Sequence, residues 1–263
     1  MSNQKKIKIC AYICLYNDHE FLSEAIDSIS PYVDKLFLIE GAWETSISSG
    51  ANPRSNEITY SIINEKINDK IILIQSNERD ETSQRQKALD ICKKENCDWI
   101  ISLDADEIWT EEGFKELYEC LEERLDKNDF FGIKLSSYNF FNTFYQYYHG
   151  LYPRVYRNTP DAVVYNCNHV YWPGHDRNVN NYFELTSEKS KFYHYSYVRK
   201  NQDLFHLKMR FLKLENGNDL YACGYGLTEE NIYSIPINDI NNFTGHHPLC
   251  IQSKIISWNL TNE

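Results

Sequence analysis

The first half of the chain alternates apolar runs with amphipathic stretches. Four short runs are almost continuously apolar, as in strands covered on both faces, and they lie at residues 7–16, 35–40, 70–75 and 98–103. Each is followed by a stretch with apolar residues at helical spacing, at residues 20–29, 56–67, 80–96 and 111–127. Four strand–helix alternations predict a parallel sheet with right-handed crossover connections.

The pattern changes after residue 128. Residues 130–158 are rich in aromatics with hairpin-like breaks, and residues 190–200 alternate as a strand does. Residues 201–216 predict an amphipathic helix, and an irregular tail follows. No repeat or low-complexity linker separates the halves, so we expect one α/β fold, an open, mostly parallel sheet flanked by helices. Its expected parts are residues 1–128, a β-rich elaboration at 129–199, and a C-terminal helix and tail at 200–263 packed on the same domain.

Composition narrows the class of protein. The formal net charge of −11 argues against nucleic acid as a general partner. No apolar run reaches the roughly 18 residues of a membrane-spanning helix. The first run is interrupted by Tyr12, Tyr16 and Asn17, so we interpret it as a strand and not as a signal peptide. A cytoplasmic location is expected, with peripheral membrane association left open. The eight cysteines form no repeated pairs, which favours reduced, mostly buried thiols over a zinc site.

Three acids follow the fourth predicted strand directly. Asp104, Asp106 and Glu107 lie within four positions, at the carboxyl end where open parallel sheets bind ligands. Their mutual repulsion favours a divalent cation, and oxygen ligands suit Mg²⁺ or Mn²⁺ bound together with substrate phosphates. In the alternative interpretation, the acids cap the next helix and are only solvated. The position after a buried strand favours a metal–nucleotide site.

At this point the sequence resembles a known family. The segments "ICAYICLYNDHEFLSEAIDSI", "KLFLIEG", "RQKAL" and "DWIISLDADEIWT" are similar, in this order, to the nucleotide-binding half of family-2-like glycosyltransferases with a GT-A fold. The resemblance covers roughly residues 7 to 112. It implies an enzyme that moves a sugar from a nucleoside diphosphate, often UDP, onto an acceptor hydroxyl.

The resemblance also implies roles for three residues before the acidic cluster. Tyr16, in a motif of which only Tyr16 and Asn17 match, would stack on the base, although a role as a core residue at the strand end is the alternative. Glu40 would read the base or ribose. Arg85 would face the diphosphate or the second carboxylate, or else is a surface arginine of a helix.

Asp104 and Asp106 match the DxD pair of the family. Asp106 is the metal ligand that the resemblance favours, and Asp104 would hold the nucleotide or the sugar. Glu107 is a candidate for an additional sugar contact or for support of the metal ligands.

The second half would complete the metal site. His194 lies in a strand-like segment where relatives often carry His, Tyr and Arg, and a nitrogen ligand would shift the preference toward Mn²⁺. Arg199 would bind the diphosphate. The alternative for His194 is a buried, hydrogen-bonded strand histidine.

The general base is less well defined. Inverting transfer needs a carboxylate or histidine to take the acceptor proton. Where relatives have a His-Glu pair this chain has His169 followed by valine, so we expect Asp176 to substitute, with His169 and Glu184 as further candidates. If none of them serves, a retaining reaction or an unusual acceptor is implied.

Two arginines and a histidine-containing turn in the second half allow more than one interpretation. Arg154 and Arg157 are expected to share one strand face, either to hold phosphate or an acidic acceptor, or simply to face solvent. The "FTGHHP" segment is expected to be a turn that folds over the site, without metal ligands.

Two other functions stay open. A nucleotidyltransferase of similar fold would need a Gly-rich phosphate loop soon after the first strand, which "LYNDHEF" does not supply. A non-catalytic nucleotide-sugar-binding module would explain the missing acid after His169. A glycan, a lipid-linked sugar and a protein side chain all remain possible acceptors.

Overall fold

The structure is a computed structural model, and it describes residues 7–48, 50–127, 131–141, 143–166, 169–173, 182–200 and 240–258. The predicted helix at 201–216 lies outside these residues. Within them, no helix combines the length and the apolar character needed to cross a bilayer.

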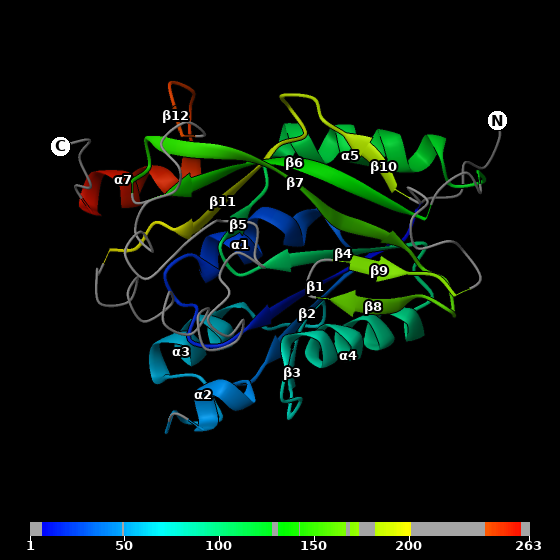
Figure 1. The fold of residues 1–263 in the computed structure, drawn as a ribbon, viewed down its shortest axis with the longest axis horizontal. Helices are drawn as coiled ribbons and strands as arrows, with labels where there is room; N and C mark the ends of the chain where they lie inside the picture. Colours follow the sequence, from blue (N-terminus) through cyan, green and yellow to red (C-terminus); the bar gives the residue numbers. More distant parts are fainter. Residues whose placement is uncertain are drawn as a thin grey trace.

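Four parallel strands form the centre of the first half (Figure 1). They are β1 (Ile9–Leu15), β2 (Lys35–Glu40), β3 (Ile71–Gln75) and β4 (Trp99–Asp104). Their spatial order is β3-β2-β1-β4, and the pairings β2–β3, β1–β2 and β1–β4 are all parallel. The strand order therefore reverses between β1 and β4, and the predicted parallel sheet is confirmed.

Helices cover both faces of this sheet. The longer ones are α1 (Leu22–Ile29), α3 (Glu57–Lys66), α4 (Glu81–Lys94) and α5 (Glu111–Glu123). Alternate residues of β1 enter two different cores: Ile9, Ala11 and Ile13 pack with α1 and α5, and Cys10 and Cys14 pack with α4. This two-sided burial is why the strand is continuously apolar.

The helix starts follow local sequence signals. Asp80 caps α4 by accepting a hydrogen bond of 2.8 Å from the Ser83 N–H. Thr110 caps α5 in the same way through Gly113, at 3.0 Å. Such caps satisfy amide donors that have no partner within the helix.

The second half extends the same sheet. The hairpin of β6 (Gly132–Phe141) and β7 (Gln146–Arg157) joins it by antiparallel pairing of β7 with β4. β11 (Phe192–Tyr197) runs parallel to β6, and β5 (Glu107–Ile108) pairs antiparallel with β11. The full order is β3-β2-β1-β4-β7-β6-β11-β5. This topology brings the segment after β4 beside β11, which positions the site.

Shorter elements complete the described residues. Two further strands join the large sheet, β10 (Tyr182–Leu185) and β12 (Asn241–Asn242), and β8 (Val163–Asn166) pairs with β9 (His169–Tyr171). The short helical elements are η1 (Ser30–Tyr32), α2 (Glu44–Ser48), η4 (Leu249–Ile251) and α7 (Gln252–Trp258). The periodicity in the sequence did not indicate α2, β5 or α7, because each is too short to show a period.

Candidate functional site

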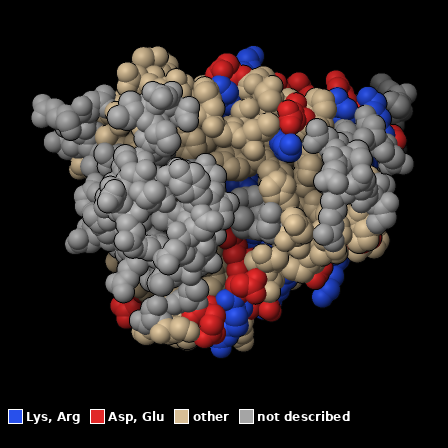
Figure 2. Space-filling model, in the orientation of Figure 1, with Lys and Arg blue, Asp and Glu red and all other residues tan. Residues whose placement is uncertain are grey.

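The acidic cluster lies at the carboxyl end of the parallel strands. Asp104 is the last residue of β4, and β4 lies next to β1 where the strand order reverses. Figure 2 shows one face of the molecule, which has a hollow near its middle. Basic side chains lie inside the hollow and acidic side chains lie at its lower edge. The location is the one at which open α/β sheets bind ligands.

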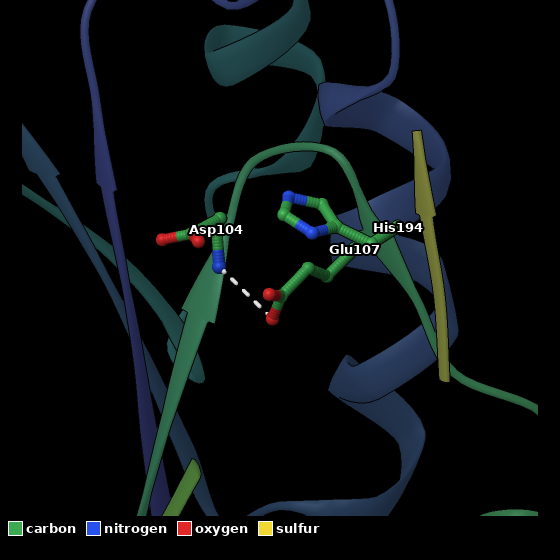
Figure 3. Close-up of side chains that lie close together, drawn as sticks. All are labelled: Asp104, Glu107 and His194. Atoms are coloured by element: carbon green, nitrogen blue, oxygen red, sulfur yellow. Dashed lines mark hydrogen bonds between the residues drawn. The ribbon is translucent and has the colours of Figure 1, made fainter. Parts of the chain in front are cut away.

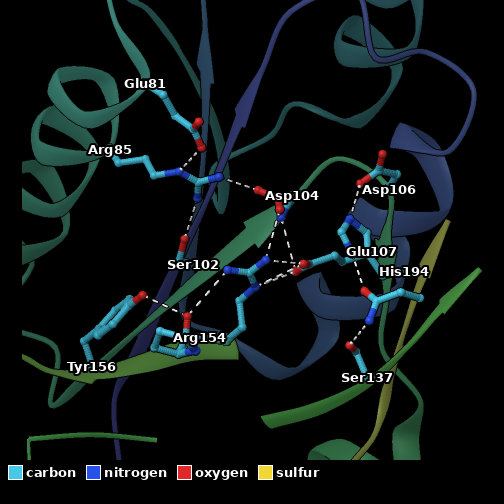
Figure 4. Close-up of polar contacts among 12 residues, drawn as sticks. Glu81, Arg85, Ser102, Asp104, Asp106, Glu107, Ser137, Arg154, Tyr156 and His194 are labelled. Atoms are coloured by element: carbon cyan, nitrogen blue, oxygen red, sulfur yellow. Dashed lines mark hydrogen bonds and ion pairs between the residues drawn. The ribbon is translucent and has the colours of Figure 1, made fainter. Parts of the chain in front are cut away.

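Two arginines hold Asp104. The guanidinium of Arg85, on α4, reaches Asp104 Oδ1 at 2.5 Å, and Arg154, on β7, reaches Asp104 Oδ2 at 3.0 Å (Figure 4). Arg85 also donates to Ser102 Oγ at 2.9 Å and to Glu81 Oε1 at 2.8 Å. Burial alone would raise the pKa of Asp104, but Arg85 and Arg154 outweigh it and hold the pKa far below its usual value. Asp104 is therefore a carboxylate at any physiological pH.

Glu107 is fully buried, and Arg154 is its ion-pair and hydrogen-bond partner. Arg154 Nε lies 3.0 Å from both carboxylate oxygens of Glu107, and its Nη2 lies 2.5 Å from Oε1. The side chains of Arg154 and Glu107 are only 1% and 0% exposed. Desolvation raises the pKa of Glu107, and the charge of Arg154 opposes that rise. Arg154 thus serves as the internal counter-ion of this part of the cluster.

Asp106 points to a different set of partners. Its Oδ1 lies 3.2 Å from His194 Nε2, and its Oδ2 lies 2.9 Å from Arg199 Nη2. Arg199 also approaches Glu20 Oε2, at 3.6 Å. Asp104 and Asp106 therefore divide the cluster into two halves, because Asp104 ends β4 and Asp106 lies in the turn that follows it.

The network carries excess negative charge. Its ion pairs contain five carboxylates (Glu20, Glu81, Asp104, Asp106 and Glu107) and three guanidinium groups (Arg85, Arg154 and Arg199). Among the described residues of the network, the carboxylates outnumber the guanidinium groups by two, because Glu20 and Glu81 each share an arginine with the acids after β4.

One group of side chains has the composition of a metal site. Asp104, Glu107 and His194 each offer a ligand atom, and these atoms lie within 4.8 Å of one another. Figure 3 shows the side chains of Asp104 and Glu107 on either side of the turn between β4 and β5, with the His194 ring beside it. Oxygen donors with one imidazole suit Mn²⁺ or Mg²⁺ better than a soft metal. Asp106, the predicted ligand, lies 3.2 Å from His194 Nε2, and its role as a ligand stays a prediction.

Glu40 and Tyr16 organise the neighbouring loop. Glu40 is 0% exposed, its Oε1 accepts the Ser55 N–H at 2.7 Å, and its Oε2 accepts the Tyr60 hydroxyl at 2.8 Å. Tyr16 follows β1 and donates its hydroxyl to the Asn52 carbonyl oxygen at 2.7 Å. Both oxygens of Glu40 are engaged by the chain itself, and the predicted nucleotide contacts of Glu40 and Tyr16 stay predictions.

Of the three candidate bases, two are described by the structure. His169 is exposed at the start of β9, and partial desolvation together with Lys134 and Arg154 lowers its pKa. Glu184 is exposed on β10 and pairs with Lys134 at 3.2 Å. Asp176 lies outside the described residues. A lowered pKa keeps His169 neutral at neutral pH, the state that can accept a proton.

The expectation that Arg154 and Arg157 share a strand face is wrong. Arg154 reaches the acidic cluster, whereas Arg157 donates to the carbonyl oxygens of Arg124 and Leu125 at 2.7 and 2.8 Å and lies over the Trp99 ring. Residues three positions apart on a strand point to opposite faces. The burial of Arg154 also excludes its reading as a solvent-facing residue.

The "FTGHHP" turn does not cover the site. His247 is buried behind β11, where its ring approaches Phe140 at 4.7 Å and its Nδ1 lies 2.8 Å from the Tyr195 hydroxyl. Because Tyr195 follows His194 directly, the two residues point to opposite faces of the strand. The turn therefore packs on the face opposite the acidic cluster.

Comparisons with known proteins complete the description of the site. A family model described as "Glycosyl transferase family 2" matches residues 10–176, which is more than half of the 263-residue chain. Among curated proteins, none matches the sequence.

Solved structures with a related arrangement include a crystal structure of S. aureus TarS 1-349, with 14% identity and a TM-score of 0.45, covering 81% of this chain and 67% of that one. Another is glucosyl-3-phosphoglycerate synthase from Mycobacterium tuberculosis in complex with Mn²⁺, UDP and phosphoglyceric acid, with 14% identity and a TM-score of 0.36. That match covers 49% of this chain and 43% of the synthase, so this chain spans less than half of it.

Proposed function

The chain belongs to glycosyl transferase family 2, and from this premise we propose that it moves a sugar from a nucleoside-diphosphate sugar to an acceptor hydroxyl with the help of a divalent cation. The family match confirms the glycosyltransferase predicted from the sequence. UDP is the donor nucleotide that the sequence resemblance implies. The observation that carries the proposal is the group of Asp104, Glu107 and His194 at the reversal point of the sheet, whose ligand atoms lie within 4.8 Å of one another.

We propose that His194 and Asp106 bind the cation, with Asp104 or Glu107 supplying a further oxygen. The donor set of carboxylates and one imidazole fits Mn²⁺, and also Mg²⁺. When bound, the cation would stabilise the negative charge of the diphosphate leaving group. The protein's own cations Arg85 and Arg199, which pair with Asp104 and Asp106, would also stabilise the negative charge of the diphosphate.

The acceptor side follows from the second half of the chain. In an inverting reaction a base takes the proton from the acceptor hydroxyl while the sugar bond to the diphosphate breaks. We propose an inverting reaction, with Asp176 or His169 as the base, and the lowered pKa of His169 supports its candidacy. The acceptor is a hydroxyl on a glycan, a lipid-linked sugar or a protein.

Slow hydrolysis of donor sugars tests the proposal without knowledge of the acceptor. The purified chain is incubated with a panel of UDP- and GDP-sugars with Mn²⁺ or with a chelator, and free nucleotide is measured. We expect Mn²⁺-dependent release of UDP from at least one UDP-sugar and its loss in Asp106→Ala. Tight, metal-dependent UDP binding without any release would favour the non-catalytic binding module instead.

A further inference from the structure

His194 is buried between two oxygen atoms. Its Nδ1 lies 2.9 Å from Asn139 Oδ1, and its Nε2 lies 3.2 Å from Asp106 Oδ1. Which ring nitrogen carries the proton is set by the chemistry of these partners. The direction of the Asn139 amide therefore decides the state of the histidine.

Two hydrogen bonds determine the direction of that amide. Asn139 Nδ2 lies 2.9 Å from Ser137 Oγ and 3.3 Å from the backbone carbonyl oxygen of Tyr148. A carbonyl oxygen only accepts, so the amide nitrogen must face it. The reversed amide would place two acceptors against each other. Asn139 Oδ1 consequently faces His194 and accepts its Nδ1–H.

A neutral imidazole has only one N–H, and here it is on Nδ1. The lone pair of Nε2 then faces a carboxylate oxygen of Asp106, so two acceptors lie 3.2 Å apart. With Nδ1–H held by Asn139, Nε2 is the ring nitrogen left facing the acids, where it binds either a proton or a metal ion. We propose that Asn139 is a positioning residue that accepts the Nδ1–H of His194 and so presents Nε2 to the divalent cation. The inference rests on the proposed function, because the cation is part of that function.

The backbone of the β6–β7 hairpin leaves space for this arrangement. Gly150 lies opposite Ser137, and a Cβ on Gly150 would lie 2.4 Å from Asn139 Nδ2 and 2.6 Å from Ser137 Oγ. Any side chain at this position would displace the amide that orients His194. Ser137, Asn139 and Gly150 thus support the proposed metal ligand His194 without touching the metal themselves.

Nitrogen NMR of the metal-free protein tests the tautomer directly. We expect the wild type to carry a proton on His194 Nδ1, the nitrogen that faces Asn139 Oδ1. In Asn139→Leu this preference for Nδ1 should be lost. A wild-type His194 whose Nδ1 carries no proton would overturn the inference whatever the metal does.

Binding of Mn²⁺ alone, followed by electron paramagnetic resonance, tests the consequence. Asn139→Leu and Gly150→Ala should bind Mn²⁺ about 10- to 100-fold more weakly than the wild type. Asn139→Asp restores an acceptor and should recover most of the affinity, which a purely structural role would not predict. The milder Ser137→Ala variant, expected to weaken binding less, serves if Asn139→Leu does not fold.

The outcomes separate the two claims. Equal Mn²⁺ affinity in the wild type and the folded Asn139→Leu variant would overturn the inference and leave the proposed function intact. A wild type that binds no Mn²⁺ would instead contradict the proposed function, and the metal role of Asn139 with it.

Discussion

Two buried histidines lie on opposite faces of the same part of the sheet, and their partners differ in one respect. His247 has a donor on one side, the Tyr195 hydroxyl, and an acceptor on the other, the Phe144 carbonyl oxygen, each at 2.8 Å. His194 has an oxygen acceptor on both sides. A neutral imidazole satisfies the first arrangement completely, whereas the second leaves one ring nitrogen to take a further proton or a metal ion.

The surroundings of the two histidines differ in the same sense. Around His247 lie the rings of Phe140, Phe144, Tyr195 and Phe243, and burial lowers its pKa to about 4. Around His194 lie acids and arginines. The comparison teaches that two equally buried histidines can have opposite hydrogen-bonding requirements, and that the partners of each ring, not its burial, show which one is a candidate metal ligand.

The largest expected effects are losses in the free energy of unfolding, from one substitution on each face of the sheet. Arg154→Met leaves Glu107 buried without its counter-ion, and we expect a loss of about 3–5 kcal/mol in the free energy of unfolding. Phe140→Ala removes a buried ring from the aromatic face and should cost a similar amount, about 3–5 kcal/mol. Urea unfolding measures both.

A second substitution distinguishes these two losses. Adding Glu107→Gln to Arg154→Met removes the orphaned charge and should restore part of the stability, but adding it to Phe140→Ala should not. Equal effects of Glu107→Gln in both backgrounds would contradict the role of Arg154 as a counter-ion.

The next effect is a pH dependence that belongs to the aromatic face. Because the pKa of His247 is about 4 in the folded state and about 6.5 when unfolded, the unfolded state binds more protons between these values. The contribution of neutral His247 to the free energy of unfolding is complete above pH about 6.5. It is lost as pH falls toward 4, by about 3 kcal/mol at most.

Unfolding at a series of pH values checks this sign. His247→Gln removes the titrating group, so its stability should fall less steeply than that of the wild type over this window. Parallel curves for the two proteins would show that His247 is not held neutral by its burial.

Metal binding should separate the two histidines. His194→Gln should weaken Mn²⁺ binding by about 100-fold, close to 3 kcal/mol, whereas the matched His247→Gln should leave the affinity unchanged while lowering stability. Titration with Mn²⁺ alone is sufficient. A comparable loss of affinity in both variants would mean that the effect spreads through the fold and not through a ligand.

The smallest expected effect concerns the donor on the aromatic face. Tyr195→Phe removes the hydroxyl that donates a hydrogen bond to His247 Nδ1. The net contribution of such a hydrogen bond to stability is about 1 kcal/mol. The loss should appear in unfolding experiments and not in Mn²⁺ affinity, because Tyr195 points away from the acidic cluster. A change in Mn²⁺ affinity would show that the two faces are coupled.

Much of the first half could be predicted from the sequence, because its signals are local. Continuous apolar runs predicted β1 to β4, and apolar residues at helical spacing predicted α1, α3, α4 and α5. The position of the acids after a buried strand placed the cluster at the sheet reversal. These features depend on neighbours along the chain, which the sequence shows directly.

The second half was less predictable, because its chemistry depends on partners far apart in the chain. Arg154 reaches Glu107, 47 positions away, and Asn139 reaches His194, 55 positions away. The spacing of Arg154 and Arg157 did contain the information that they face opposite ways, since three positions separate them. Neither the depth of Arg154 nor the amide behind His194 has a local signature.

Calorimetry of UDP binding with and without Mn²⁺ tests the central claim most directly. The acids after β4 should repel a diphosphate until a divalent cation is bound. We therefore predict measurable UDP binding in Mn²⁺ and at least a tenfold weaker affinity in chelator. UDP affinity that is the same in both conditions, or undetectable in both, would contradict a metal-dependent nucleotide-sugar site in this crevice.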